Sequence, residues 1–261
     1  MSRRIRVVLV AAIALLPMVA LAQSQAPLDE LNAAVRAARD ADLKADWDGL
    51  LDARARVAAL ESANQPPGLV AYYLGYIDWR TSSLAFLVSG QQGMAALLAR
   101  AVDHLRASVA ATPTFAEAQA LLATCAGILA GTTPSRLEEL SPVMKAAWPP
   151  ALEHGGGNPR VQLLRAMTEV FAPPQYGGNR ERGLERWSEA IRLFEREQKH
   201  ASDKGGGERW GHAEAWAWLG GAYLTMGRHK DAQAALEEAV KLRPDFWWAA
   251  KAALPQARRP K

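Results

Sequence analysis

Apolar residues recur at intervals of three and four along most of the chain, as at Val102, Leu105 and Val109. This spacing is typical of α-helices with one buried face, and no run of period two predicts a β-strand. Proline and glycine interrupt the pattern, and the segments between them have ordinary helix lengths. The interruptions lie at residues 66–67, 113, 134, 149–150, 155–159, 173–174, 177–178, 205–207 and 244. We therefore expect an all-α chain, and its regular interruptions indicate internal repeats.

The segment from Ala213 to Pro244 shows a repeat most clearly. Counting Ala213 as position 1, the occupied positions are Trp216 (4), Leu219 (7), Gly220 (8), Tyr223 (11), Gly227 (15), Ala232 (20), Leu236 (24), Ala239 (27) and Pro244 (32). The segment resembles the tetratricopeptide repeat, a helix pair with a period of about 34 residues, at every signature position.

Packing explains why these residue types stand at these positions. Gly220 and Ala232 lack bulk where two antiparallel helices would cross, so the backbones can approach closely. Gly227 tolerates the left-handed conformation that ends a helix, and Pro244 stops the second helix. The remaining signature side chains would fill the seam between the helices: Trp216, Leu219, Tyr223, Leu236 and Ala239.

Three other units follow the same count, from Gly68, Ala116 and Pro159. In the Gly68 unit, Leu74 and Gly75 take positions 7 and 8, and a long connection over residues 81–93 delays the second helix. In the Ala116 unit, the second helix is expected over residues 137–154, where the prolines at 149–150 should kink or end it.

These units predict one domain over residues 23–257. Residues 28–60 supply an opening helix pair, and residues 246–254 a short closing helix of the kind a solenoid needs at its end. With the four units above, this gives about five antiparallel helix pairs. The resemblance implies an all-α, right-handed α-α superhelix, and residues 258–261 are expected to form a disordered basic tail.

The first 22 residues have the pattern of a cleaved export signal. Arg3, Arg4 and Arg6 precede an apolar run over residues 7–21, and Ala20 and Ala22 stand where a signal peptidase reads small residues. The run is shorter than the roughly 20 residues that span a bilayer, and no cysteine follows it for lipid attachment. We expect cleavage after Ala22, a periplasmic or secreted protein, and no membrane span in the mature chain.

Charge and cysteine content narrow the function classes. The full chain carries +4, and removing the three signal arginines leaves about +1, so the chain offers no basic surface typical of nucleic-acid binding. Cys125 is the single cysteine, so no internal disulfide is possible. It lies in an apolar run and is expected to be a buried small side chain.

The resemblance also implies a binding surface. In the tetratricopeptide family, the first helix of each pair lines a concave groove through positions 2, 5, 9, 12 and 13. In the Gly68 unit these positions are Leu69, Tyr72, Tyr76, Trp79 and Arg80. Two tyrosines, a tryptophan and an arginine on one helix face have the composition of a binding hot spot. The alternative is that the 81–93 connection folds back over them.

Other candidate chemistry is weaker. His200, Asp203, His212 and Glu214 flank the glycines at 205–207, but their spacing matches no metal-ligand motif. No nucleophile motif is present, and the glycine-rich segments lack the residues of a phosphate loop. We expect no metal, no cofactor and no catalysis. Trp247 and Trp248 point about 100° apart on a helix, so one should pack and the other should be exposed.

Three functions remain open. The first is an exported, non-catalytic scaffold or adaptor that binds another protein or an extended peptide segment in the cell envelope. The second is a periplasmic protein that binds an apolar small molecule as an accessory to transport, which a closed apolar cavity between the Gly68 and Ala116 units would favour. The third is an envelope enzyme with an unrecognised site around residues 200–214.

Overall fold

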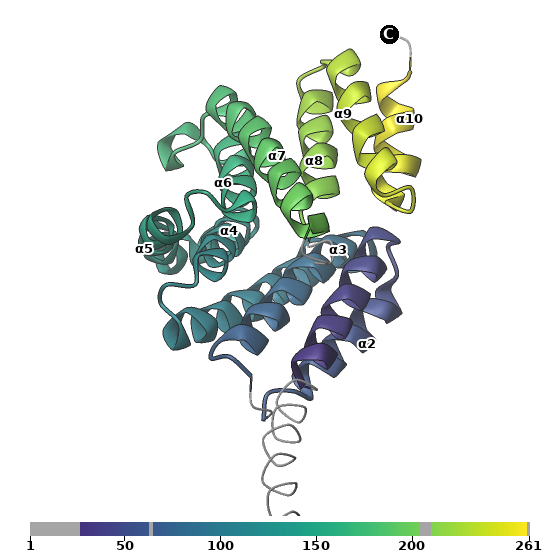
Figure 1. The fold of residues 1–261 in the computed structure, drawn as a ribbon. Helices are drawn as coiled ribbons and strands as arrows, with labels where there is room; N and C mark the ends of the chain where they lie inside the picture. The colour runs from purple at the N-terminus through teal and green to yellow at the C-terminus, as the bar shows by residue number, and fades with distance from the viewer. Residues whose placement is uncertain (1–26, 63–64, 204–209, 260–261) are drawn as a thin grey trace, which may run out of the picture.

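The computed structural model describes residues 27–62, 65–203 and 210–259, and helices dominate this part of the chain (Figure 1). Residues 27–43 are helical. The named elements are α2 (Trp47–Ala58), α3 (Leu69–Ala111), α4 (Ala116–Thr132), α5 (Leu137–Gly155), α6 (Pro159–Phe171), α7 (Arg180–Asp203), α8 (His212–Thr225), α9 (His229–Leu242), the π-helical turn η3 (Trp248–Ala253) and α10 (Leu254–Ala257). No strand occurs within these described ranges.

Consecutive helices pack as pairs, and the pairs follow one another around the molecule in Figure 1 from purple through teal and green to yellow. Helix 27–43 and α2, the two halves of α3, α4 with α5, α6 with α7, and α8 with α9 make the five pairs. The short elements η3 and α10 pack against α9. The predicted all-α, tetratricopeptide-like superhelix is confirmed.

Close backbone approach at one glycine per pair explains two of these seams. A Cβ atom added at Gly220 would lie 2.6 Å from Leu236 Cγ and 3.2 Å from the Ala232 carbonyl oxygen. A Cβ atom added at Gly75 would lie 2.6 Å from Leu105 Cγ and 3.2 Å from the Ala101 oxygen. The Gly68 unit therefore has the same seam geometry as the unit that starts at Ala213.

The turn inside the Ala213 unit depends on Gly227, whose φ of +69° is left-handed. Around it, the Gly227 amide donates to the Leu224 oxygen at 3.0 Å and the Arg228 amide to the Tyr223 oxygen at 2.9 Å. These bonds satisfy carbonyl groups that the end of α8 would otherwise leave without partners.

One segment differs from the sequence-based expectation, and another agrees with it in extent. The predicted 81–93 connection is helical: the first half of α3 continues to Ser89, and the chain reverses at Gly90, whose φ of 62° and ψ of −158° only glycine adopts without strain. Helix α5 spans the second helix expected over residues 137–154, and it continues through Pro142, Pro149 and Pro150, so the proline pair does not end it. Its buried residues Ala147, Trp148 and Ala151 flank the two prolines, and this packing offsets the two missing backbone donors.

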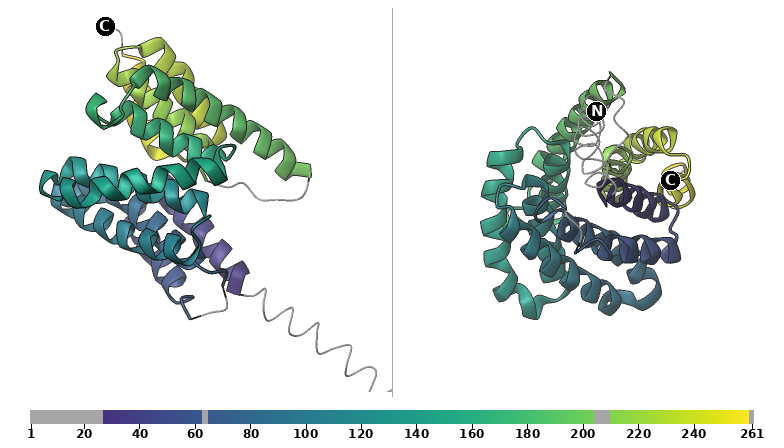
Figure 2. Two further views of the ribbon diagram at one scale, coloured as in Figure 1. Left: turned by 90° about the vertical axis from the view of Figure 1, so that its left-hand side faces the viewer. Right: turned by 60° about the horizontal axis from the view of Figure 1, so that its bottom comes forward.

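The first and last pairs also meet, which the sequence pattern did not predict. Leu43, at the end of helix 27–43, is fully buried in one apolar cluster with Ala213, Leu236 and Ala239 of α8 and α9. Beside it, Arg243 donates to Asp40 Oδ1 at 2.8 Å. The right-hand view of Figure 2 shows the purple helices next to the yellow ones, so the superhelix closes into a ring.

The ends of the chain bear on two expectations. The predicted signal, residues 1–22, lies outside the described residues. At the other end, Arg258 is not part of a disordered tail, because its Nη2 donates to Glu237 Oε1 of α9 at 2.9 Å. The repeat packing of α8 and α9 leaves that glutamate on the surface, where it can hold the arginine.

Candidate functional site

The aromatic face predicted to line an open groove lies inside the ring. Tyr72, Tyr76, Trp79 and Arg80 are each less than 10% exposed, and Leu69 is half-buried. Of the two alternatives for this face, an open groove or a covered one, the burial of these side chains agrees with the covered one. These four side chains are core material in this fold.

Two tryptophans from the C-terminal part of the chain cover this face. The ring of Trp210, which comes just before α8, lies 5.1 Å from that of Tyr76 and 6.0 Å from that of Trp79. The ring of Trp218 in α8 lies 5.8 Å from that of Trp79. The cover thus comes from the far end of the sequence, and the 81–93 segment, expected as the alternative cover, extends α3 instead.

Arg80 is held by a carboxylate from the opening helix. Its Nε donates to Asp42 Oδ2 at 2.8 Å, its Nη2 donates to the same oxygen, and its guanidinium lies 5.3 Å from the ring centre of Trp218. Burial raises the pKa of the Asp42 carboxyl, and Arg80 opposes this rise. The ion pair therefore joins helix 27–43 to α3, and the contact of the guanidinium with Trp218 joins α3 to α8.

Tyr72 belongs to a second buried polar group. Its hydroxyl donates to Glu117 Oε2 at 3.0 Å and accepts from Trp210 Nε1 at 3.3 Å, while Asn158 Nδ2 donates to Glu117 Oε1 at 2.9 Å. Burial, with Glu117 next in importance, raises the pKa of Tyr72 well above its ordinary value. The phenol stays protonated, and its hydrogen bonds connect α3 with α4 and with Trp210.

Arg160 closes this group on the other side. Both of its terminal nitrogens donate to the carboxylate of Glu197, at 3.0 and 2.9 Å, and its guanidinium lies 5.4 Å from the ring centre of Phe194 and 5.7 Å from that of Trp210. A buried guanidinium needs such a bidentate partner to offset its desolvation. The contacts fix Trp210 in place over α3.

Among the described residues, two buried oxygen atoms near Arg80 have no hydrogen-bond partner: the Tyr76 hydroxyl and Glu214 Oε1. The other oxygen of Glu214 accepts from the Gly211 amide at 3.0 Å and caps α8. Burial raises the pKa of Tyr76, with Arg80 opposing. The Tyr76 phenol therefore stays protonated near neutral pH and packs as part of the core.

Of the residues weighed for metal binding, His212 and Glu214 are buried in packing, and His200 is exposed. His212 stacks on Phe194 with ring centres 5.7 Å apart, and the side chain of Asp203 lies outside the described residues. Within the described ranges, no three His, Cys, Asp or Glu side chains converge as a metal site would require. Cys125 is buried, and burial raises the pKa of its thiol.

The exposed apolar side chains form a different surface, which the sequence reasoning missed. Phe86, Leu87 and Val88, at the tip of the α3 hairpin, are 51%, 69% and 76% exposed. The available signal was the charge pattern, since residues 81–99 contain no Asp, Glu, Lys or Arg. Of the paired tryptophans, one was expected to pack and the other to be exposed, but both are exposed, Trp247 at 43% and Trp248 at 36%, although Trp248 also lies against Gly221.

None of the described helices is both long enough and apolar enough to cross a bilayer.

Comparison with known proteins agrees with this geometry. The family model of the tetratricopeptide repeat matches residues 213–246, which contain α8, α9 and the glycine seam between them. No curated protein matches the chain. Residues 213–246 match the tetratricopeptide repeat, and the described part of the chain is an all-α, tetratricopeptide-like superhelix.

Proposed function

We propose that the protein is an exported, non-catalytic scaffold that holds another protein in the cell envelope. The tetratricopeptide repeat is a protein–protein interaction module, which supports the scaffold role. The basic, apolar and small-residue pattern of residues 1–22 supports export. The buried state of Tyr72, Tyr76 and Cys125 supports a non-catalytic role, because these groups do not titrate or react where they lie.

The partner surface is the tip of the α3 hairpin, and this exposed patch is the observation that carries the proposal. Phe86, Leu87 and Val88 expose three contiguous apolar side chains, although water-facing helix ends are usually polar. The nearest charged residues along the chain are Arg80 and Arg100. The matching partner is therefore a protein with an apolar pocket and no charged lining, since a charge buried against this tip would lack an ion-pair partner.

The small-molecule alternative gains no support from the interior of the ring. A cavity between the Gly68 and Ala116 units would have favoured it. Trp210 fills the space beside Tyr72 and Tyr76 instead.

Site-specific crosslinking tests the proposed surface. A photoreactive side chain at Leu87 should crosslink to one discrete protein in envelope extracts, and the added variants Phe86→Ser and Val88→Ser should abolish that product. Leu51 is the matched control, because it is also an exposed leucine, at 42%, on a different pair. Equal crosslinking at positions 87 and 51, or a product that survives both serine changes, would contradict the assignment.

A further inference from the structure

One signature position of the repeat, which is apolar in other units, holds a charged residue in the α6–α7 pair. Position 7 is leucine in three units, at Leu74, Leu122 and Leu219, and each of these side chains is buried. In the unit that starts at Pro159, the same position is Arg165. A residue that breaks the local packing rule of its own repeat is where function is expected to replace stability.

Part of the polar chemistry around Arg165 has a structural explanation, which the Gly68 unit provides. There, position 11 is the buried Asp78, and it accepts from Arg100 at 2.7 Å. Arg100 directly precedes Ala101, the small seam residue of the second helix, and His104 follows Ala101 by three positions with Nε2 3.7 Å from Asp78. An acid on the first helix thus pairs with an arginine of the second helix and lies near a histidine of that helix.

The α6–α7 pair repeats this clamp. Position 11 is the buried Glu169, whose Oε2 accepts from Arg186 Nε at 2.9 Å and whose Oε1 lies 3.1 Å from Arg182 Nε. Arg182 directly precedes the small residue Gly183, and Arg186 follows Gly183 by three positions. These contacts account for Glu169, Arg182 and Arg186 as residues that pair the two helices. They do not explain why position 7 is an arginine, Arg165.

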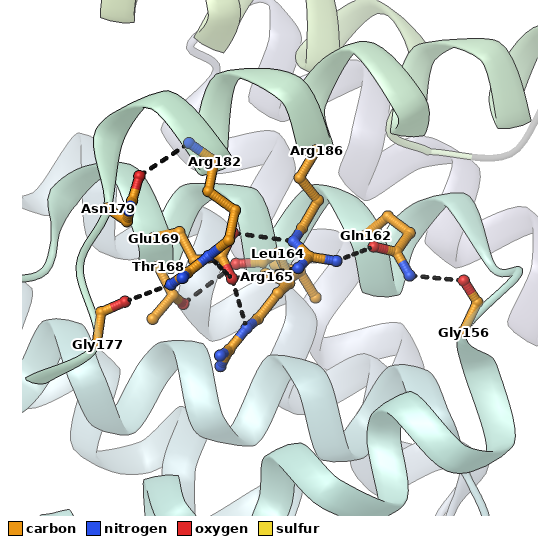
Figure 3. A network of polar contacts seen from close by, with 10 residues as sticks. All are labelled: Gly156, Gln162, Leu164, Arg165, Thr168, Glu169, Gly177, Asn179, Arg182 and Arg186. Atoms are coloured by element: carbon orange, nitrogen blue, oxygen red, sulfur yellow. Dashed lines mark hydrogen bonds and ion pairs between the residues drawn. The ribbon is translucent and has the colours of Figure 1, made fainter.

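The geometry of Arg165 leaves one end of its guanidinium available. Its Nε donates to Glu169 Oε1 at 3.1 Å, and its guanidinium lies 4.8 Å from the ring centre of Trp148 on α5. Among the residues that the structure describes, neither of its terminal nitrogens has a hydrogen-bond partner, and the side chain is 24% exposed. Figure 3 shows Arg182 and Arg186 reaching Glu169 from α7, while Arg165 runs from α6 past Glu169 and ends beyond it.

The local charge is unbalanced in favour of an anion. Three guanidinium groups surround the single carboxylate of Glu169. The Nε atoms of Arg165 and Arg182 each lie 3.1 Å from Glu169 Oε1. The two Nε atoms are therefore separated by at most twice this distance. Burial lowers the pKa of Arg165, and the charges of Arg186 and Arg182 lower it further.

We propose that Arg165, with Arg182 beside it, binds an oxyanion, either a carboxylate or a phosphate group, at the junction of α5 and α6. The planar guanidinium fork presents two parallel N–H donors that match both oxyanions. The ring of Trp148 lies against the Arg165 guanidinium and covers one side of it. Glu169 positions Arg165 through Nε and leaves the terminal nitrogens for the ligand.

The repeat itself supplies the test variant, Arg165→Leu. Leucine is the residue at position 7 of three other units, so this change should preserve folding and the melting temperature. Binding of inorganic phosphate and of acetate is measured by titration calorimetry, with chloride at matched ionic strength as the reference. Arg196→Leu is the matched control, because Arg196 is an arginine on α7 that is 62% exposed and whose ion pair within the described residues is with Glu189. Arg165→Gln is the second variant, in case leucine impairs folding.

We expect the wild type and Arg196→Leu to bind one or both oxyanions above the chloride reference, and both Arg165 variants to bind about tenfold more weakly or not at all. The anion that binds identifies the source, phosphate or carboxylate. Oxyanion affinity that is equal in the wild type and the Arg165 variants overturns the site. So does the absence of phosphate and acetate binding by the wild type.

Discussion

Trp79 is 4% exposed and lies among the rings of Tyr76, Trp210 and Trp218, with Arg80 stacked 5.0 Å from its ring centre. A side chain in this setting contributes through buried area and ring geometry. Its loss would leave a cavity between α3 and residues 210–218, two segments that are far apart in the sequence. The residue therefore matters for folding before it can matter for any partner.

We predict that Trp79→Ala lowers the free energy of unfolding by about 3–5 kcal/mol, the usual cost of truncating a buried tryptophan. Trp247→Ala is the control, because Trp247 is 43% exposed, and it should cost less than about 1 kcal/mol. Urea unfolding followed by circular dichroism measures both. A Trp79 variant as stable as the wild type would mean that this face is not packed in solution.

The spacing of residues along the chain predicts contacts within one repeat, but it does not predict contacts between distant units. The contact of Gly220 with Leu236 joins residues of one repeat, so a local count predicts it. The contacts of Trp210 with Tyr76 and Trp79 join residues from different units, and no local period encodes which distant side chain covers a helix face. The same tyrosines and tryptophan fit a groove or a core equally well by composition, and only the tertiary cover decides between them.

At the scale of the helical elements, the clamp on Asp78 joins α2 to both halves of α3. Arg54 Nε of α2 donates to Asp78 Oδ1 at 2.7 Å, and Arg54 Nη2 lies 3.2 Å from His104 Nε2. A guanidinium can only donate, so His104 Nε2 accepts and the imidazole is neutral, with its proton on Nδ1. Protonation of His104 would place a third cation beside Arg54 and Arg100.

This arrangement predicts a pH dependence of stability. Burial lowers the pKa of His104; Arg54 and Arg100 add to the decrease, while Asp78 and Glu61 oppose it. Because the folded pKa lies below the unfolded value of about 6.5, the unfolded state binds more protons as the pH falls, and stability declines below that pH. Unfolding by urea at about pH 8 and about pH 5.5 should show this loss.

His104→Gln is the control for this prediction. The glutamine amide oxygen can still accept from Arg54 but does not titrate in this range. The variant should therefore lose less stability between the two pH values than the wild type does. An equal loss in both proteins would assign the pH dependence to other groups.

At the scale of the whole molecule, closure of the ring is what separates this chain from an open row of repeats. In an open row, each unit contacts only its neighbours. Here, Leu43 of the first pair is buried in the core of the fifth, and Asp40 accepts from Arg243. The stability of the C-terminal repeat therefore depends on the N-terminal helix.

We predict that Leu43→Ala destabilises the protein by about 2–5 kcal/mol, and that hydrogen exchange speeds up in α8 and α9 as well as in helix 27–43. Leu50→Ala is the comparison, because Leu50 is equally buried but lies in the other apolar cluster. It should affect its own pair and α3 first. Faster exchange confined to the first pair in the Leu43 variant would show that the ring is open in solution.

Closure also sets the order in which the chain can finish folding. The ion pair between Arg243 and Asp40 joins residues 203 positions apart, so the opening helix emerges from the ribosome long before its partner exists. At roughly 5–20 residues per second, that delay is on the order of tens of seconds. During it, Leu43 has no core to enter, and local growth from one pair to the next cannot bury it. The packing of helix 27–43 against α8 and α9 is therefore the last step in the folding of a newly made chain.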